Sequence, residues 1–117
     1  MSIVLARPPR RGPSFGVSVK ADGTGKKVVT ACGEVDIATA HLLDAHLGRA
    51  SRDCGEVVVD MTGISFMDAS GLTALIHADN RARARGVRLR LARVPDRIAR
   101  LFRITRLDER FDIACEG

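Results

Sequence analysis

One hydroxyl in the middle of the chain stands where a side chain can take part in chemistry. Ser70 follows an apolar segment, and the apolar residues Leu72, Leu75 and Ile76 after it recur at helical spacing. Ser70 is therefore expected at the start of a helix, where serine is among the most favoured N-cap residues. A serine at this position presents its hydroxyl to the positively polarised end of the helix. Such a group is either a plain structural cap or a reactive site.

Nucleophilic catalysis by Ser70 is excluded by geometry. His77 and Asp79 suggest a serine-histidine-aspartate triad, but seven residues along one helix separate Ser70 from His77 by about 10 Å. A nucleophile and its base need a separation of about 3 Å. The chain also has no Gly-x-Ser-x-Gly elbow, no glycine-rich phosphate loop and no metal-ligand cluster. We therefore expect no enzyme activity, no cofactor and no metal site.

The segment that precedes this helix is predicted to contain the central strand. Residues 57–59 are three consecutive valines, a β-branched run typical of a strand buried on both faces. Asp60 is expected to end the strand, and Thr62 and Gly63 are expected to turn the chain. The apolar residues Ile64, Phe66 and Met67 would then return to the core.

Two further strands and a helix are predicted upstream. Residues 15–19 alternate between apolar and polar side chains, residues 27–35 carry a second apolar strand pattern, and the turn residues 22–25 between them predict a hairpin. From residue 38 the apolar period becomes helical, with Asp36 or Thr39 as its cap. The expected inner face of this helix is Ala40, Leu43, Leu47 and Ala50.

Downstream of Ser70 the pattern predicts a long helix, a strand, a second helix and a short strand. The long helix is expected to point Asp79 outward and to end at Gly86, a residue type favoured just beyond a helix end. Residues 87–91 alternate as a half-buried strand. Residues 98–105 carry the inner stripe of the last helix, and residues 111–115 form the final strand.

The predicted order of elements is β-β-α-β-α-β-α-β. Helices between consecutive strands imply parallel pairs with right-handed crossovers, and the opening hairpin adds an antiparallel pair. We therefore expect an α/β fold of one domain, with a mixed, mostly parallel β-sheet of about five strands and helices packed on it.

The length and composition fit a single domain of ordinary globular type. The chain has 117 residues and 45% hydrophobic residues, and no apolar run approaches the ~20 residues of a membrane helix. Residues 1–13 are rich in proline and arginine and are expected to form a flexible leader. The apolar run at residues 2–6 is too short for a signal peptide, so a cytoplasmic location is expected. The three cysteines form no CxxC pair and are expected to be free thiols.

Positive charge is concentrated in the C-terminal half. Between Arg81 and Arg110 there are eleven arginines against three carboxylates, a local balance of +8, whereas the whole chain carries +5. This excess either marks a surface for an anionic partner or reflects arginine at ordinary solvated positions. The four phenylalanines fit core positions, which leaves no stacking platform for single-stranded nucleic acid. No direct contact with nucleic acid is expected.

Three motifs in matching order resemble the STAS family and, within it, the bacterial anti-sigma-factor antagonists. The first resembles the family's entry into its first helix, the second its central signature and the third its C-terminal motif. The matching segments are residues 33–36 with Thr39 and Ala40, Asp60 with residues 68–72, and residues 101–108 with 111–113. Arg106 stands where the family usually has glycine, which argues against a tight turn at that helix end but not against the fold.

The resemblance implies a STAS domain over residues 14–117 and a phosphorylation site at Ser70. In the family the unmodified protein binds an anti-sigma factor that is also its serine kinase, and this binding frees a sigma factor. The phosphorylated protein does not bind, and a serine/threonine phosphatase restores it. Other members are scaffolds without a switch or lipid-transport subunits, and these remain alternatives, ahead of nucleic-acid binding. The identities of the kinase, phosphatase and sigma factor, and the oligomeric state, stay open.

The resemblance also implies a partner-binding surface around Ser70. Asp68 is expected either to orient the hydroxyl or to cap the turn, and Gly71 either to admit another chain closely or simply to be permissive. Asp36 and Thr39 should lie near Ser70 if the two strands that precede the helices are parallel neighbours. The implied partner-binding residues are Asp36, Thr39, Asp68, Ala69, Ser70, Gly71 and Leu72.

Overall fold

Residues 15–114 build a sheet of five strands with three helices. The computed structural model describes residues 15–114, and the expected leader and Cys115 lie outside them. The observed order of elements, β-β-α-β-α-β-α-β, is the predicted one. The elements are β1 (Gly16–Ala21), β2 (Lys26–Val35), α1 (Ala40–Ala50), β3 (Glu56–Met67), α2 (Ala69–Ala84), β4 (Arg88–Ala92), α3 (Asp96–Ile104) and β5 (Asp112–Ile113).

The strands lie side by side in the order of the sequence, from β1 to β5. Strands β2, β3, β4 and β5 are parallel neighbours, and β1 pairs antiparallel with β2. The hairpin between β1 and β2 closes as predicted, because the Thr24 amide and hydroxyl donate to the Asp22 carboxylate at 2.8 and 2.6 Å. These bonds hold the pKa of Asp22 below its ordinary value.

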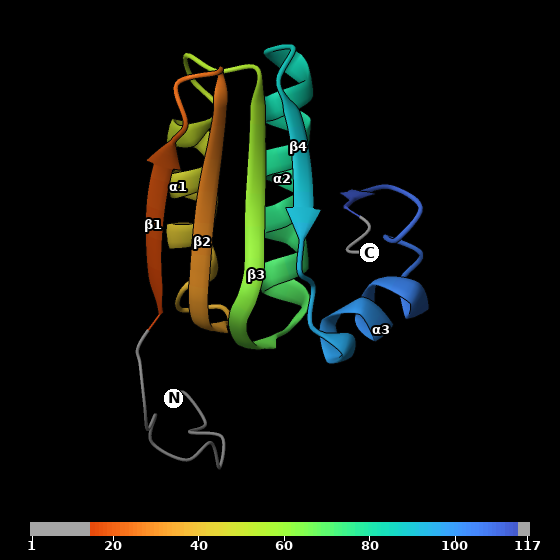
Figure 1. Cartoon of the computed structure of the whole chain (residues 1–117). Helices are drawn as coiled ribbons and strands as arrows, with labels where there is room; N and C mark the ends of the chain where they lie inside the picture. The colour runs from red at the N-terminus through yellow and green to blue at the C-terminus, as the bar shows by residue number, and fades with distance from the viewer. Residues whose placement is uncertain (1–14, 115–117) are drawn as a thin grey trace.

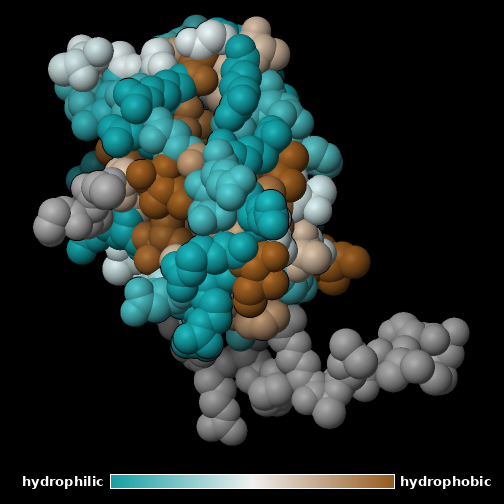
Figure 2. Space-filling view, turned by 90° about the vertical axis from the view of Figure 1, so that its right-hand side faces the viewer, coloured by the Kyte–Doolittle hydropathy of each residue, from teal (hydrophilic) through white to brown (hydrophobic). Residues whose placement is uncertain are grey.

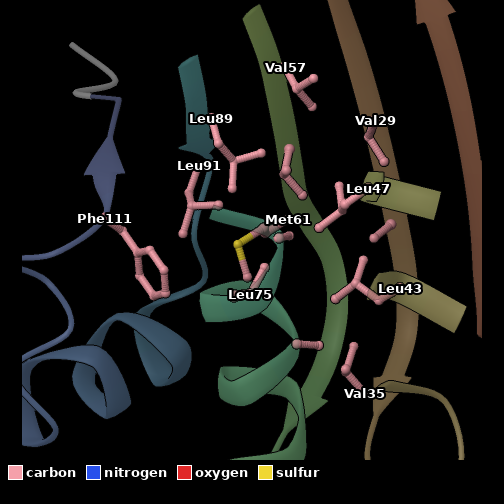
Figure 3. Close-up of a cluster of buried hydrophobic side chains, with 14 of the residues drawn as sticks. Val29, Val35, Leu43, Leu47, Val57, Met61, Leu75, Leu89, Leu91 and Phe111 are labelled. Atoms are coloured by element: carbon pink, nitrogen blue, oxygen red, sulfur yellow. The ribbon is translucent and has the colours of Figure 1, made fainter. Parts of the chain in front are cut away.

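Helices α1 and α2 lie next to each other across one face of the sheet, and α3 lies beyond the end of β4 (Figure 1). The inward pleat of β3 supplies Val57 and Met61 to the same buried cluster as Leu43 and Leu47 of α1, and Met61 lies beside Leu75 of α2 (Figure 3). All four predicted inner residues of α1 are buried. The period of the apolar residues therefore placed both the strand and the helix face correctly.

The central strand is longer than predicted, since β3 runs through Asp60 and Gly63 to Met67. The expectation that the chain turns here was wrong. The Asp60 carboxylate accepts bonds from the Thr62 amide and hydroxyl at 3.0 and 2.7 Å, which bends the strand locally without ending it. The register with β2 shifts twice in this stretch, as β-bulges do. At Gly63 a Cβ would come within 2.8 Å of the Cβ of Cys32, so this glycine permits close strand contact.

Asp79 was expected to face solvent, but it is 4% exposed. Its carboxylate lies 3.1 Å from the guanidinium of Arg83, one turn along α2, and 3.4 Å from that of Arg110. Arg110 belongs to the segment between α3 and β5, which returns to α2. The expectation failed because two arginines replace the water that an exposed carboxylate would need.

Helices α2 and α3 end in the same way. In α2 the Val87 amide donates to the Ala82 carbonyl at 2.8 Å, and Gly86 has a φ of +72°, as predicted for a glycine that ends a helix. In α3 the Leu107 amide donates to the Phe102 carbonyl at 2.8 Å. Arg106 has a φ of +62°. The tight turn therefore forms despite the arginine. The expectation that Arg106 would prevent a tight turn at this helix end was wrong.

Candidate functional site

The first turns of α1 and α2 meet at one edge of the sheet. Strands β2 and β3 are parallel neighbours, so both end at this edge and deliver the chain to the two helices (Figure 1). A hydrogen bond joins the two connections directly, from the Asp68 amide to the Val35 carbonyl at 3.2 Å. The predicted proximity of the two strand-to-helix connections is confirmed.

Asp68, not Ser70, caps helix α2. The carboxylate of Asp68 accepts a hydrogen bond from the Ser70 amide at 2.9 Å, and Asp68 has extended backbone angles. The prediction that Ser70 is the N-cap residue was therefore wrong. Ser70 lies inside the first turn and uses its amide for the cap. Within residues 15–114 its hydroxyl has no hydrogen-bond partner, so the oxygen is not needed to hold the helix.

At the start of α1, Asp36 and Thr39 form a buried turn. Asp36 is 2% exposed, and its carboxylate accepts a bond from the Ala38 amide at 2.9 Å. The Thr39 hydroxyl donates to the Glu34 carbonyl at 2.7 Å and accepts from the Asp36 amide at 3.0 Å. Thr39 is the N-cap residue by position, although its side chain makes no capping bond to the helix. Both residues hold the loop in shape and present almost no surface.

Ser70 lines a groove between α1 and α2. The groove has a volume of about 190 Å³ and is lined by Ala40, His41, Asp44, Ser70, Thr73, Ala74 and His77. Asp44 is already paired with Arg81 of α2, at 2.5 Å. In the part of the chain that the structure describes, no hydrogen bond links Ser70 to His41 or His77. Ser70 is therefore not hydrogen-bonded to a histidine of this groove.

The residues around Ser70 divide into an exposed set and a buried set. Ala69 is exposed, and Ser70 and Asp68 are half-buried. Gly71 and Leu72 are buried. A Cβ on Gly71 would lie 2.5 Å from Cγ of Met67 and 3.0 Å from Cγ1 of Val35. Gly71 therefore lets the side chains of Met67 and Val35 pack closely against α2. Because it is buried, it offers no surface to another chain.

One exposed residue at this edge was missed by sequence reasoning. Ile37, in the turn between β2 and α1, is 83% exposed. Single exposed apolar side chains are common on protein surfaces, so Ile37 matters here for its place, because it adds apolar area to the edge where α1 and α2 begin. The signal was present, because Ile37 is an apolar residue outside the helical stripe of α1 and next to Asp36.

No helix within residues 15–114 is long and apolar enough to cross a membrane, and those residues contain no cluster of metal-ligating side chains.

The site around Ser70 consists of a hydroxyl without a hydrogen-bond partner among the described residues, a capped helix start and exposed neighbours. Such an edge is suited to contact with another protein and to covalent modification of the hydroxyl.

Comparisons with known proteins agree with this architecture. A family model described as "Mlab, STAS domain" matches residues 19–114. The anti-sigma-B factor antagonist of Listeria monocytogenes is 31% identical over 101 residues, which are 86% of this chain and 89% of that protein.

Solved structures share the fold. An anti-sigma factor antagonist from Mycobacterium paratuberculosis has a TM-score of 0.76 at 24% identity, covering 88% of this chain and 87% of that one. The phosphorylated form of SpoIIAA, a Bacillus cell fate determinant, has a TM-score of 0.65 at 18% identity, covering 86% of this chain and 93% of that one.

Proposed function

This chain belongs to the STAS domain family, and we propose that it is an anti-sigma-factor antagonist. In this proposal the unmodified protein binds an anti-sigma factor that is also a serine kinase. This binding frees a sigma factor. Phosphorylation of Ser70 by the kinase ends the binding, and a serine/threonine phosphatase restores it in the cytoplasm.

One observation carries the proposal. The hydroxyl of Ser70 is half-exposed at the edge where two helices begin, and among the described residues it has no bonding partner. A relative of similar length is named an anti-sigma-B factor antagonist, and a protein of the same fold has been solved in a phosphorylated form. A kinase can reach such a hydroxyl without unfolding the protein.

A phosphate on Ser70 would change binding more than it changes folding. It adds about −1.5 to −2 charges at neutral pH. The helix dipole favours an anion at the start of α2 by roughly 0.3–1 kcal/mol. The first turn of α2 carries no acidic residue that would repel the phosphate. The neighbouring Asp68 carboxylate opposes it. The two effects are of similar size, and the fold should tolerate the modification.

A partner that covers Ser70 meets a larger cost. Burying the phosphate in a dry interface without a pairing cation costs several kcal/mol. A loss of about 4 kcal/mol weakens affinity about a thousandfold. The contact surface in this proposal is Ala69, Ser70 and Ile37, with Asp68 contacting at its rim. Four buried residues fix the shape of this surface from the core side: Asp36, Thr39, Gly71 and Leu72.

The alternative is a STAS scaffold or lipid-transport subunit without a switch. This alternative is retained because the matching family model is described as "Mlab, STAS domain" and not as an anti-sigma-factor antagonist. In that case binding of the protein's partner would not depend on the charge at position 70.

The test is direct binding to each anti-sigma-factor serine kinase encoded in the same genome. Wild type and Ser70→Ala should bind one of these kinases, and Ser70→Asp should bind it at least about a hundredfold more weakly. Ser18→Asp, which adds the same charge at an exposed position on β1, should bind normally. With ATP, mass spectrometry should find phosphate on the Ser70 peptide of the wild type. Equal binding by Ser70→Asp would disprove the charge-based switch, and no binding to any kinase would disprove the function.

A further inference from the structure

The arginines of the C-terminal half form two groups. In the first group each side chain is held by the protein itself. Arg81 pairs with Asp44, Arg83 and Arg110 pair with Asp79, Arg88 pairs with Asp112, Arg90 lies 3.5 Å from both Glu56 and Asp112, and Arg85 donates to the Gly48 carbonyl and the Ser51 hydroxyl. These arginines stabilise the fold, so they account for part of the basic excess.

The second group lies on and around α3. It consists of Arg93, Arg97, Arg100, Arg103 and Arg106, all of them exposed. Within residues 15–114 none of the five side chains has an ion-pair or hydrogen-bond partner. Between residues 93 and 106 the only carboxylate is Asp96, so five positive charges against one leave a balance of +4.

Helix α3 places some of these charges on the same face as an exposed apolar side chain. Arg97, Arg100 and Ile104 are spaced i, i+3 and i+7, which places them on one face of the helix. Ile98 and Phe102 occupy the opposite, buried face. Ile104 is 72% exposed. We call Arg97, Arg100, Arg103 and Ile104 the α3 arginine face; Figure 2 views the molecule from the side where α3 lies, and hydrophilic residues cover much of it.

The α3 arginine face is connected to the edge that carries Ser70. A hollow of about 180 Å³ is lined by Ser65, Phe66 and Met67 at the end of β3 and by Arg97, Ile98 and Leu101 of α3. Asp68 follows Met67 directly and caps the helix of Ser70. Arg97 therefore lines the segment of β3 that ends three positions before Ser70. A partner that covers Ser70 and extends across this segment reaches α3.

We propose that the α3 arginine face binds an acidic patch on the same protein partner that covers Ser70. This inference rests on the proposed function and adds the chemistry of the partner. Arginine is enriched in protein interfaces, where it pairs with carboxylates around an apolar centre. Because no carboxylate of the described residues holds these guanidinium groups, they are available to steer an acidic partner before contact.

Nucleic acid and membrane fit this face less well. An exposed isoleucine beside the charges gains nothing against a phosphate backbone. Phe66, which was expected in the core, is 43% exposed and lines the hollow beside Arg97, but it is one ring and not the series of aromatic side chains on which successive bases stack. Stable attachment to a membrane surface needs a larger apolar face than one isoleucine. An acidic protein surface satisfies both the arginines and Ile104.

The experiment measures association with the anti-sigma-factor kinase that binds the wild type, at about 50 mM and about 500 mM NaCl. Arg97→Gln combined with Arg100→Gln should lower the association rate constant roughly tenfold at the lower salt, and by less than about twofold at the higher salt. The matched control is Arg49→Gln combined with Arg52→Gln. It removes two exposed arginines at the opposite end of α1 and should stay within about twofold of wild type at both salts.

The outcomes separate the two proposals. If the α3 variant associates like wild type while Ser70→Asp does not bind, the α3 inference is wrong and the switch stands. If no kinase binds the wild type, both are wrong. If instead the wild type binds a random DNA duplex or phosphatidylglycerol vesicles, and the α3 variant loses that binding but still associates normally with the kinase, the face serves a different partner and the inference is overturned.

Discussion

Gly86 and Arg106 occupy the same position, two residues beyond the last residues of α2 and α3, and both have left-handed backbone angles. Their φ values are +72° and +62°. Equivalent hydrogen bonds close both turns, from Val87 to Ala82 and from Leu107 to Phe102. The turn after α2 has glycine, the residue type that this conformation favours. The turn after α3 has arginine, whose Cβ makes the same conformation sterically unfavourable.

Arg106→Gly should therefore stabilise the protein. The left-handed conformation costs a non-glycine residue roughly 1–2 kcal/mol, and the greater freedom of glycine in the unfolded chain cancels part of the gain. We expect the free energy of unfolding in urea to rise by about 0.5–1 kcal/mol. The reverse change, Gly86→Arg, should lower it by a similar amount. A loss of stability in Arg106→Gly would contradict this account of the turn.

Asp68→Ala should lower the free energy of unfolding by about 1 kcal/mol, because the Ser70 amide loses its capping partner. Asp68→Asn keeps an oxygen that can accept this bond and should retain most of the stability. Ser70→Ala should be nearly neutral, since the cap uses the amide of Ser70. Urea denaturation of the three variants measures this. A larger loss in Ser70→Ala than in Asp68→Ala would show that the serine hydroxyl is the true cap.

Ser70→Asp should fold normally. The added carboxylate meets a favourable helix dipole and an unfavourable neighbour in Asp68, so the free energy of unfolding should change by less than about 1 kcal/mol. The amide resonances of the core strands should keep their wild-type positions in a heteronuclear NMR spectrum. Widespread shifts would mean that charge at this position alters the fold, and loss of partner binding would then need a different explanation.

Gly71→Ala should be destabilising, since the new Cβ would lie 2.5 Å from Cγ of Met67. Overpacking of this kind costs about 1–3 kcal/mol. Gly55→Ala is the matched control, because its Cβ would meet only the Gly25 carbonyl oxygen at an ordinary 3.8 Å. The control should be neutral or slightly stabilising. Thermal unfolding of both variants gives the comparison, and equal stability would mean that α2 does not pack as tightly on β2 and β3 as described.

The layers of the fold were predictable because burial follows local periods. The valines of β3 and the stripe of α1 repeat at the spacing of a strand and of a helix, and each is buried as expected. The errors arose where a distant contact decides the local structure. Asp60 and Gly63 have the composition of a turn, yet the close approach of Cys32 from β2 keeps them in a bulged strand.

Burial of Asp79 was not predictable for a related reason. Its ion pair with Arg83 is local and would also form on an exposed helix face, as i, i+4 pairs do. The contact that encloses it comes from Arg110, 31 positions along the chain. A single sequence carries no signal for that contact.

The candidate site was predicted in part. Two good capping residues, Asp68 and Ser70, stand two positions apart, and their spacing alone cannot decide which one caps α2. The sheet decides it: the bond from the Asp68 amide to the Val35 carbonyl fixes Asp68 directly after β3, at the N-cap position of α2. The proximity of the two strand-to-helix connections, by contrast, followed from parallel strands alone.

That single bond between the two connections also governs how a partner is received. It ties the start of α2 to the end of β2, so we expect the two strand-to-helix connections to keep their positions when a partner binds. Encounter should then be a one-step event, with an observed rate that rises linearly with partner concentration and reaches no plateau. Folding itself would order the surface that a partner contacts, so binding would carry no further entropic cost of ordering. Phosphorylation would then block a surface that is already in its binding conformation.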